Sequence, residues 1–211
     1  MAEREWLLNI NGRNVVIVAV INGLKSEIAI VREALEKHRP DIIGISATEK
    51  QVEYLRKWNG SEEVDQPEYS DFDLLYAREM SKFGDVVLPS PAQLFAVEVA
   101  DRAGIEIAAL EMSDGDYAEL YMKFVKPHSL FIDSIFRRRR LRKVFDGTAE
   151  EVVLKLDSTG RHPKGVELLD SERERHIAAE IARISEGHRL LLALVDYERS
   201  AGIRKAMENR Q

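Results

Sequence analysis

Hydrophobic residues along this chain fall into short unbroken runs and into longer stretches with helical spacing. The strongest unbroken run, 15–21, is mostly β-branched and is typical of a strand buried on both faces of a parallel sheet. Asn22 and Gly23 follow this run, and both residue types tolerate the backbone geometry of a sharp turn. Helical spacing then predicts a helix over 26–39, with Ser26 as its N-terminal cap.

The same alternation continues along the first half of the chain. An Asn11-Gly12 pair between the runs 6–10 and 14–21 predicts a β-hairpin whose first strand forms an antiparallel edge. Further strands are expected at 41–46, 85–88 and 105–110, helices at 48–58, 72–80 and 92–103, and a surface loop at 59–69. Strands and helices that alternate with short connections favour a parallel sheet with helices on both faces.

The second half of the chain has a different character. Residues 114–157 show helical patterns and no convincing strand, which indicates a helical insert. A loop at 160–165, a long helix at 168–185, a buried strand at 189–195 and a closing helix at 200–209 follow. The sequence therefore predicts one α/β domain over 1–211: a mostly parallel sheet covered by helices on both faces, an N-terminal hairpin edge and an insert at about 114–157.

Composition narrows the protein class. Hydrophobic residues make up 45% of the chain and charged residues 32%, which is typical of a globular protein. The net charge of -6 argues against nucleic-acid binding, and the absence of cysteine excludes disulfides and thiolate chemistry. No apolar run approaches the roughly 18 residues that span a bilayer, and no signal peptide is evident, so we expect a cytoplasmic protein. Many charges and no cysteine also suit a thermophile.

Familiar catalytic motifs are missing from the sequence. The five histidines share no i, i+4 spacing, which argues against a histidine metal site. There is no G-x-S-x-G elbow, P-loop or dinucleotide fingerprint. Acyl transfer through an activated serine and nucleotide binding therefore lose their usual support.

Polar residues gather instead where the predicted strands end. They are Asn22, Ser46, Thr48, Glu49, Glu111, Ser113, Asp114, Asp116, Asp196, Glu198 and Arg199. Because parallel strands bring their carboxyl ends to one edge, we expect these side chains to converge there. Such an oxygen-rich group suits Mg²⁺, another hard cation or a cationic ligand. The alternative is that strand ends are polar by default and that the acids cap helices.

A second candidate feature is the basic segment 136–143. It carries Arg137, Arg138, Arg139, Arg140, Arg142 and Lys143. Such a run favours contact with phosphate, nucleic acid or an anionic membrane surface. Apolar residues interleave with the arginines, however, and acids occur at 149–151 and 170–174. An exposed face that pairs with these acids explains the run equally well.

The order of these segments resembles the TraB family, the PrgY/Tiki/GumN relatives with an EreA/ChaN-like fold. Residues 16–33 resemble the family's first strand and helix, and 39–43 (RPDII) resemble its "rPD" step into the next strand. Residues 92–112 resemble its later helix and strand, and 172–178 (ERERHIA) resemble its "ERD-ryMa" helix. The final strand and the motif after it are similar to 191–203, so the resemblance spans most of the chain.

The chain departs from the family at the positions that carry its chemistry. The family's first histidine corresponds to Asn22, the glutamate after its second strand to Ser46, and its final histidine to Arg199. The glutamate that opens the later helix corresponds to Ala92, and the Asp-Arg pair to Glu111-Met112. The resemblance implies metal-dependent hydrolysis, which needs cation ligands and a base to activate water. These replacements remove most of that chemistry. Asparagine and serine coordinate a cation only weakly, and the positive charge of arginine repels one.

Three functions follow from these residues. The first is a diverged, non-catalytic pseudoenzyme that binds a small anionic ligand or a protein partner through Asn22, Gly23, Ser46, Glu111 and Arg199. The second is a hydrolase with a carboxylate site rebuilt around Mg²⁺ or Mn²⁺ from Glu49, Glu111, Asp114, Asp196 and Glu198. The third is an anion or membrane-surface binder that uses the basic segment. An exposed apolar face on the insert would also allow a homodimer.

Overall fold

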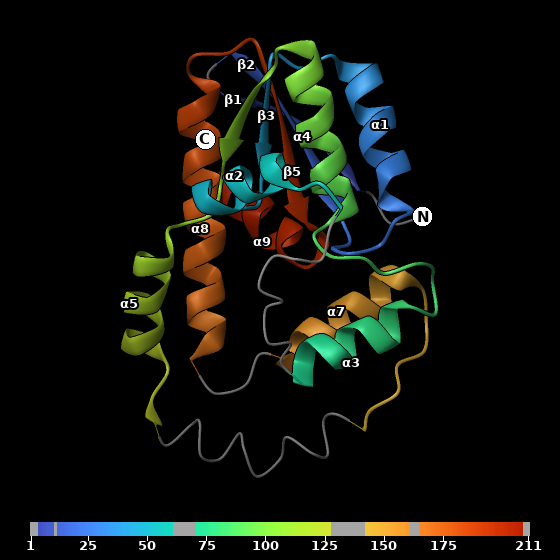
Figure 1. Ribbon diagram of the computed structural model, residues 1–211. Coiled ribbons are helices and arrows are strands. Elements are labelled where there is room, and N and C mark those ends of the chain that lie inside the picture. The colour runs from blue at the N-terminus through green and yellow to red at the C-terminus, as the bar shows by residue number, and fades with distance from the viewer. Residues whose placement is uncertain (1–3, 11, 61–70, 128–141, 161–164, 209–211) are drawn as a thin grey trace.

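A five-stranded sheet lies at the centre of the computed structural model, which describes residues 4–10, 12–60, 71–127, 142–160 and 165–208 (Figure 1). The strand order is β1 (Glu5–Ile10), β2 (Arg13–Val20), β5 (Leu190–Asp196), β3 (Ile42–Ile45) and β4 (Glu106–Ala109). β1 pairs with β2 in antiparallel fashion, and the other three pairings are parallel. The predicted fold class, with its hairpin edge and surrounding helices, is confirmed.

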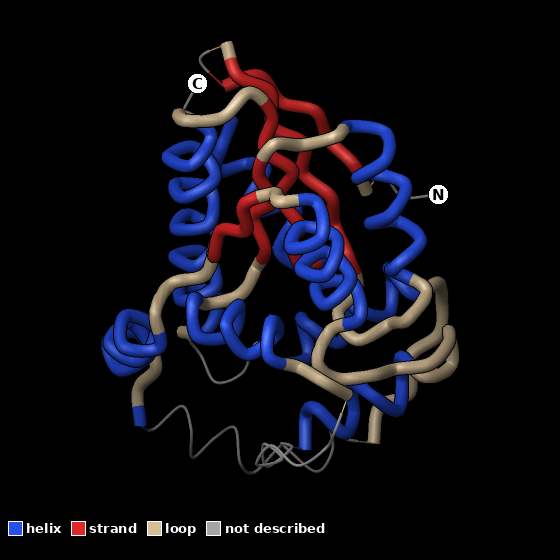
Figure 2. The backbone as a smooth tube through the Cα atoms, turned by 45° about the horizontal axis from the view of Figure 1, so that its top comes forward, coloured by secondary structure: helices blue, strands red, loops and turns tan. Residues whose placement is uncertain are grey.

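Helices cover both faces of this sheet. The described helices are α1 (Glu27–His38), α2 (Glu49–Lys57), α3 (Asp71–Met80), α4 (Pro91–Ala103), α5 (Asp114–Phe124), α7 (Ala149–Gly160), α8 (Val166–Ser185) and α9 (Tyr197–Glu208). α1 and α4 pack on one face, and α8 and α9 pack on the other. Figure 2 shows the strands enclosed between these two helical layers. α3 and α7 lie beyond the carboxyl ends of the strands (Figure 1).

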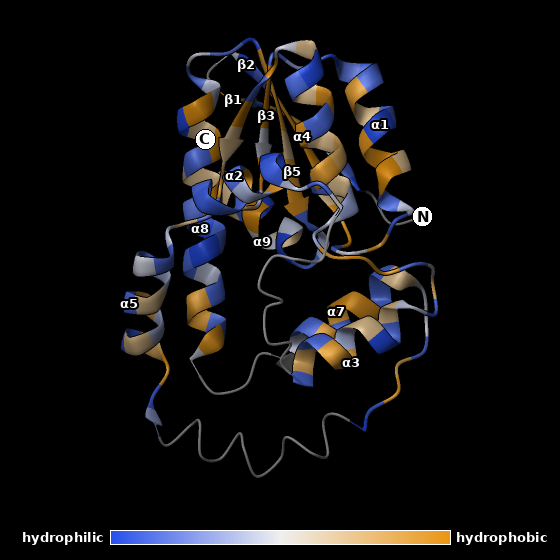
Figure 3. Cartoon of the chain, in the orientation of Figure 1, coloured by the Kyte–Doolittle hydropathy of each residue, from blue (hydrophilic) through white to orange (hydrophobic). Residues whose placement is uncertain are grey.

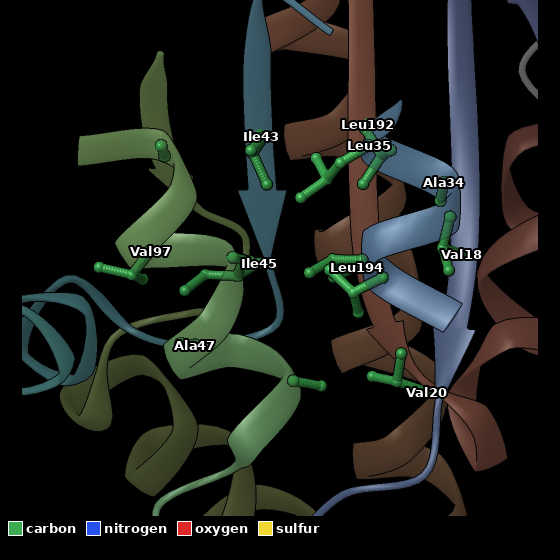
Figure 4. Close-up of a cluster of buried hydrophobic side chains, with 14 of the residues drawn as sticks. Val18, Val20, Ala34, Leu35, Ile43, Ile45, Ala47, Val97, Leu192 and Leu194 are labelled. Carbon is green, nitrogen blue, oxygen red and sulfur yellow. The ribbon is translucent and has the colours of Figure 1, made fainter. Parts of the chain in front are cut away.

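The continuous apolar run of β2 is explained by burial on both faces. Val16, Val18 and Val20 belong to the core under α1 and α4, and their neighbours Val15, Ile17 and Ala19 belong to the core under α8 and α9. In Figure 4 side chains of the first core, including Ile45 and Leu194, point from the sheet toward α1 and α4. Figure 3 shows that the strands are largely apolar, whereas the helices carry both apolar and polar residues.

A third, smaller core joins α3 and α7 to the end of β2. It contains Ile21, Leu24, Leu75, Met80, Phe145, Val152, Val153 and Leu156. Glu79, which is 1% exposed, accepts hydrogen bonds from the backbone N–H of Phe145 at 3.1 Å and from Lys82 Nζ. This buried carboxylate therefore fixes α3 to the chain that leads into α7.

Arg4 connects three separate parts of the fold. Its Nη1 lies 2.6 Å from Glu27 Oε2 on α1, and its Nη2 lies 2.7 Å from Glu150 Oε1 on α7. Glu27 is buried and also accepts a hydrogen bond from the backbone N–H of Ile21. The start of the chain, α1 and α7 are thus held by one set of charge-assisted hydrogen bonds.

Two predicted local features are wrong. Residues 85–88 do not form a strand of the sheet. Their β-type pairing is limited to one isolated bridge between Val86 and Leu24. The segment pairs with the turn after β2 instead, where the Val87 N–H donates to the Gly23 carbonyl at 2.8 Å. Ser26 does not cap α1 with its side chain, since its backbone is already helical (φ -61°, ψ -24°).

Within the predicted insert, the structure describes the helices α5 and α7. Several predicted features lie outside the described residues. They are the basic residues 137–140, most of the loop predicted at 59–69, residues 161–164 of the next loop, Asn11 of the hairpin turn and residue 209 of the closing helix. Among the helices that are described, none has the length and apolarity needed to cross a membrane.

Gly44 allows β3 to lie close to the segment after β4. A Cβ added to Gly44 would come within 2.9 Å of Leu110 Cδ2, and Leu110 is fully buried. We therefore expect Gly44→Ala to lower the free energy of unfolding by about 1–3 kcal/mol, measured by urea denaturation. In a Leu110→Ala background the same substitution should cost much less, because the two side chains no longer overlap. Equal costs in both backgrounds would contradict this packing.

Candidate functional site at the carboxyl edge of the sheet

The connections at the carboxyl edge of the sheet diverge around β5. The chain leaves β2 and β3 toward the layer that contains α1 and α4, whereas it leaves β5 into α9 on the opposite face. β5 lies between β2 and β3 in the sheet. Parallel α/β sheets bind ligands in the crevice that forms where neighbouring connections diverge in this way. Asn22, Ser46 and Asp196 follow or end these three strands.

Asp196 and Glu198 are two carboxyl groups in the turn from β5 into α9. Burial raises the pKa of Asp196 to about 6; the charge of Glu111 adds to the rise, while Arg173 and Arg199 oppose it. Burial also raises the pKa of Glu198 to about 8, with a further rise from Asp196 and opposition from Arg199. At neutral pH Glu198 therefore holds a proton, and Asp196 is mostly ionised.

Arg199 is directed toward the protein's own carboxylates. Its Nη2 lies 2.9 Å from Asp157 Oδ1 on α7, and its Nη1 lies 2.9 Å from Asp170 Oδ2 on α8. The Arg199 side chain is only 11% exposed. The guanidinium that was predicted to contact an anionic ligand thus joins α9 to α7 and α8, and its charge is balanced there.

Glu111 also has an internal partner, Arg173 on α8. Glu111 Oε1 lies 2.8 Å from Arg173 Nη2, and Glu111 Oε2 accepts a longer hydrogen bond from Nε at 3.3 Å. The Arg173 guanidinium also lies over the ring of Tyr117 at 5.7 Å. Sequence reasoning did not single out Arg173 as a site residue, although it lies in the 172–178 segment that resembles a family motif.

Within the described part of the chain, three small polar side chains near this edge have buried oxygen atoms without a hydrogen-bond partner: Asn22 Oδ1, Ser46 Oγ and Ser90 Oγ. The carbonyl of Asn22 is occupied, because it accepts a hydrogen bond from the Tyr76 hydroxyl at 2.8 Å. The carbonyl of Ser46 accepts one from Gln93 Nε2 at 3.1 Å. Ser90 was missed at the sequence level because it follows no sheet strand.

A cavity of about 380 Å³ opens between this edge and α3. Its apolar wall is formed by Phe72, Leu74, Tyr76, Ala77, Val86 and Leu88. Its polar groups come from Asn22, Gly23, Asp73 and Glu198. Oε2 of Glu198 is buried and has no hydrogen-bond partner in the ranges that the structure describes. The φ of Gly23 is +82°, and a Cβ there would lie 3.2 Å from Val86 Cγ1, so this turn favours glycine.

A second cavity, of about 500 Å³, lies beside the end of β4 and is more polar. Three of the acids predicted to bind a metal, Glu49, Glu111 and Asp114, line it, whereas Glu198 lines the first cavity. Asp114 pairs with Lys50 at 3.3 Å. Over the described ranges, no three histidine or acidic side chains are grouped so that they could hold a metal ion. The predicted carboxylate set is therefore divided between two places.

The end of the basic segment is visible in the structure. Arg142 and Lys143 are exposed, and the carbonyl of Lys143 accepts a hydrogen bond from Arg78 Nη2 at 2.8 Å. The prediction that 137–143 binds anions or pairs with nearby acids stays a prediction, because its four consecutive arginines lie outside the described residues.

The two cavities thus offer different chemistry, one apolar with buried acceptors and one polar with paired charges. Comparison of the chain with models of known protein families and with curated proteins finds no match.

Proposed function

We propose that this chain is a binding protein, a diverged and non-catalytic relative of the TraB-like proteins, that takes a small molecule into the apolar cavity at the carboxyl edge of its sheet. One observation carries the proposal. Asn22 Oδ1 and Glu198 Oε2 are buried oxygen atoms without a hydrogen-bond partner among the described residues, and both residues line this cavity. A buried polar atom without a partner costs about 1–3 kcal/mol, so a ligand that supplies the partner is stabilised at that point.

The size and lining of the cavity also support ligand binding. Small-molecule pockets have volumes of about 300–1,000 Å³ and combine mainly apolar walls with a few polar groups. The cavity has about 380 Å³, and six of its ten lining residues are Phe72, Leu74, Tyr76, Ala77, Val86 and Leu88. Leu74 and Leu88 are 58% and 49% exposed, so apolar surface continues outward from the cavity.

An anionic ligand held by Arg199 finds less support than the binding function itself. The Arg199 guanidinium lies between Asp157 and Asp170 at 2.9 Å from each. An anion at Arg199 would displace one of these carboxylates and leave it without its counterion in a buried position. The ligand in this proposal therefore binds the acceptors of the cavity rather than the guanidinium.

A carboxylate-bound divalent cation is the second candidate. Glu111 raises the pKa of Asp196, and Asp196 raises the pKa of Glu198, so Asp196 lies within electrostatic reach of both other acids. Mg²⁺ or Mn²⁺ would offset that repulsion. A cation at this place would support the hydrolase alternative. Glu111 would then bind the metal in place of Arg173.

A thermal-shift screen separates the two candidates. We expect small apolar fragments that carry a hydrogen-bond donor to raise Tm by several degrees at about 100 times Kd, because binding to the folded state adds about 2.7 kcal/mol there. Ala77→Phe fills the cavity and should abolish the shift, whereas Ala103→Phe, at the exposed end of α4, should retain it.

Two outcomes of this screen count against the small-molecule proposal. A shift caused by MgCl2 or MnCl2 alone and lost in Glu111→Gln would favour the hydrolase. Fragment-induced shifts that persist in Ala77→Phe would place the ligand elsewhere.

A further inference from the structure

Among the residues that the structure describes, more acids than arginines surround the step from β5 into α9. Two guanidinium groups, Arg173 and Arg199, act on the acids Glu111, Asp157, Asp170, Asp196 and Glu198. Arg173 makes a two-point contact with Glu111, and Arg199 is divided between Asp157 and Asp170. Among the described residues this leaves Asp196 and Glu198 without an arginine of their own. A positive charge close to these two acids is therefore favoured.

The hydrogen-bonding groups at the cavity point to the same charge. Two atoms of its lining residues, Asn22 Oδ1 and Glu198 Oε2, have no hydrogen-bond partner among the described residues, and both are acceptors once Glu198 is ionised. The Tyr76 hydroxyl also lines the cavity, but it already donates its hydrogen to the Asn22 carbonyl. A ligand must therefore bring donors. An ammonium group brings three donors and a positive charge, whereas a carboxylate or phosphate brings acceptors and a negative charge.

The cavity wall restricts the rest of the ligand. Phe72, Leu74, Val86 and Leu88 contribute hydrocarbon surface to a cavity of about 380 Å³. Such a wall binds an alkyl or aryl group and excludes a strongly hydrated body. Asp73, on the α3 side of the same cavity, adds a further acid to its lining.

We propose that the ligand of this cavity is a primary amine on an alkyl or aryl body, whose ammonium group donates hydrogen bonds to Glu198 Oε2 and Asn22 Oδ1. This inference rests on the proposed function and specifies the chemical class of its ligand. Glu198 is the counterion, Asn22 orients the ammonium group, and the residues of α3 cover the hydrocarbon body.

Binding of the amine is linked to the release of a proton. The groups that face Glu198 are Asp196 in its own turn, Arg199 on α9, Asp157 on α7, and Tyr76 on α3. Glu198 has a pKa of about 8 in the free protein, so at pH 7 it must lose its proton to pair with an ammonium group. Below about pH 8 the affinity should therefore rise roughly tenfold per pH unit.

Isosteric probes test this proposal on the whole chain. Benzylamine, benzyl alcohol and benzoate share one body and differ in charge and in donors. In isothermal titration calorimetry at pH 7.5 we expect benzylamine to bind at least tenfold more tightly than benzyl alcohol, and benzoate to show no binding. The benzylamine Kd should decrease about tenfold from pH 6.5 to pH 7.5, and proton release should appear as a dependence of the heat on the buffer.

Matched variants assign the effect to Glu198. Glu198→Gln should weaken the binding of benzylamine at least tenfold and leave the binding of benzyl alcohol unchanged. Glu208→Gln, on the exposed end of the same helix, should change neither affinity. Asn22→Asp adds a carboxylate beside the ammonium group and should strengthen benzylamine binding, which provides a readout if Glu198→Gln fails to fold.

The outcomes distinguish this inference from the function on which it rests. If benzyl alcohol or benzoate binds as tightly as benzylamine, and Ala77→Phe abolishes this binding, the amine specificity is overturned. The proposal of a small-molecule binding cavity then remains. The absence of binding by all three probes, together with a fragment screen unaffected by Ala77→Phe, would overturn both. Benzylamine binding that is independent of pH between 6.5 and 7.5 would remove Glu198 as the counterion.

Discussion

Replacing Arg199 with methionine is expected to destabilise the protein by about 3–5 kcal/mol. The substitution removes a partner of two carboxylates, Asp157 and Asp170, whose side chains are 11% and 5% exposed. Breaking a buried ion pair from one side costs this much because the remaining carboxylate loses the positive charge of the guanidinium. Asp196 and Glu198 would also lose a positive neighbour that opposes the rise in their pKa values. Urea unfolding at pH 7 measures the change.

Arg204→Met is the matched control for this prediction. Arg204 lies on the same helix and pairs with Glu208 at 3.5 Å, but the two side chains are 42% and 56% exposed. Exposed pairs contribute about 0–1 kcal/mol, so this variant should remain close to the wild type. Similar losses in both variants would mean that Arg199 acts through general packing of α9 rather than through its ion pairs.

The second large effect is an unusual dependence of stability on pH. The folded state raises the pKa of Glu198 to about 8 and that of Asp196 to about 6. A carboxyl group with a raised pKa stabilises the fold below its unfolded value, and this contribution is lost as the pH rises through the folded value. We therefore expect a loss of several kcal/mol between about pH 4.5 and pH 8.

Other carboxyl groups have the opposite effect at low pH. Burial alone would raise the pKa of Glu79, but hydrogen bonds from Lys82, the Phe145 N–H and Arg78 lower it below its ordinary value. The pKa of Asp41 is lowered in the same way by the N–H groups of Arg189 and Leu190. Their contributions are present above the unfolded pKa and disappear as the pH falls through the folded one. The two opposing trends place the stability maximum on the acidic side of neutrality.

Urea unfolding between pH 4 and pH 8.5 measures this profile. Glu198→Gln should flatten the decline above pH 5, because glutamine does not titrate, whereas Glu208→Gln should leave the decline unchanged. A wild-type protein that gains stability from pH 5 to pH 8 would contradict the raised pKa values on which the prediction rests.

Much of the fold could be predicted because the sheet is buried on both faces. The unbroken run 15–21 appears as β2 because each successive side chain enters one core or the other. The 85–88 prediction failed because a short apolar run has the same appearance whether it enters a sheet or lies beside a turn. Val86 contributes to the third core from outside the sheet, and the sequence holds no sign of this placement.

The position of the candidate site could be predicted from the sequence, but the ion pairs between its residues could not. Asn22 and Glu198 could be expected at the carboxyl edge because strand ends determine where their backbones lie. The pairing of Arg199 with Asp157 and Asp170 could not, because it depends on how α7 and α8 pack after long connections. Arg173 was missed for the same reason, since only the packing of α8 against the end of β4 brings it to Glu111.

The contacts of Arg4 bear on how the molecule opens. Arg4 precedes the first strand and contacts Glu150, which lies 146 residues further along the chain, at the beginning of α7. α7 shares its core with α3, and α3 forms one side of the ligand cavity. Fraying at the amino terminus would therefore remove one of the contacts that hold α7, so local unfolding of the outermost strand is expected to loosen the far wall of the cavity.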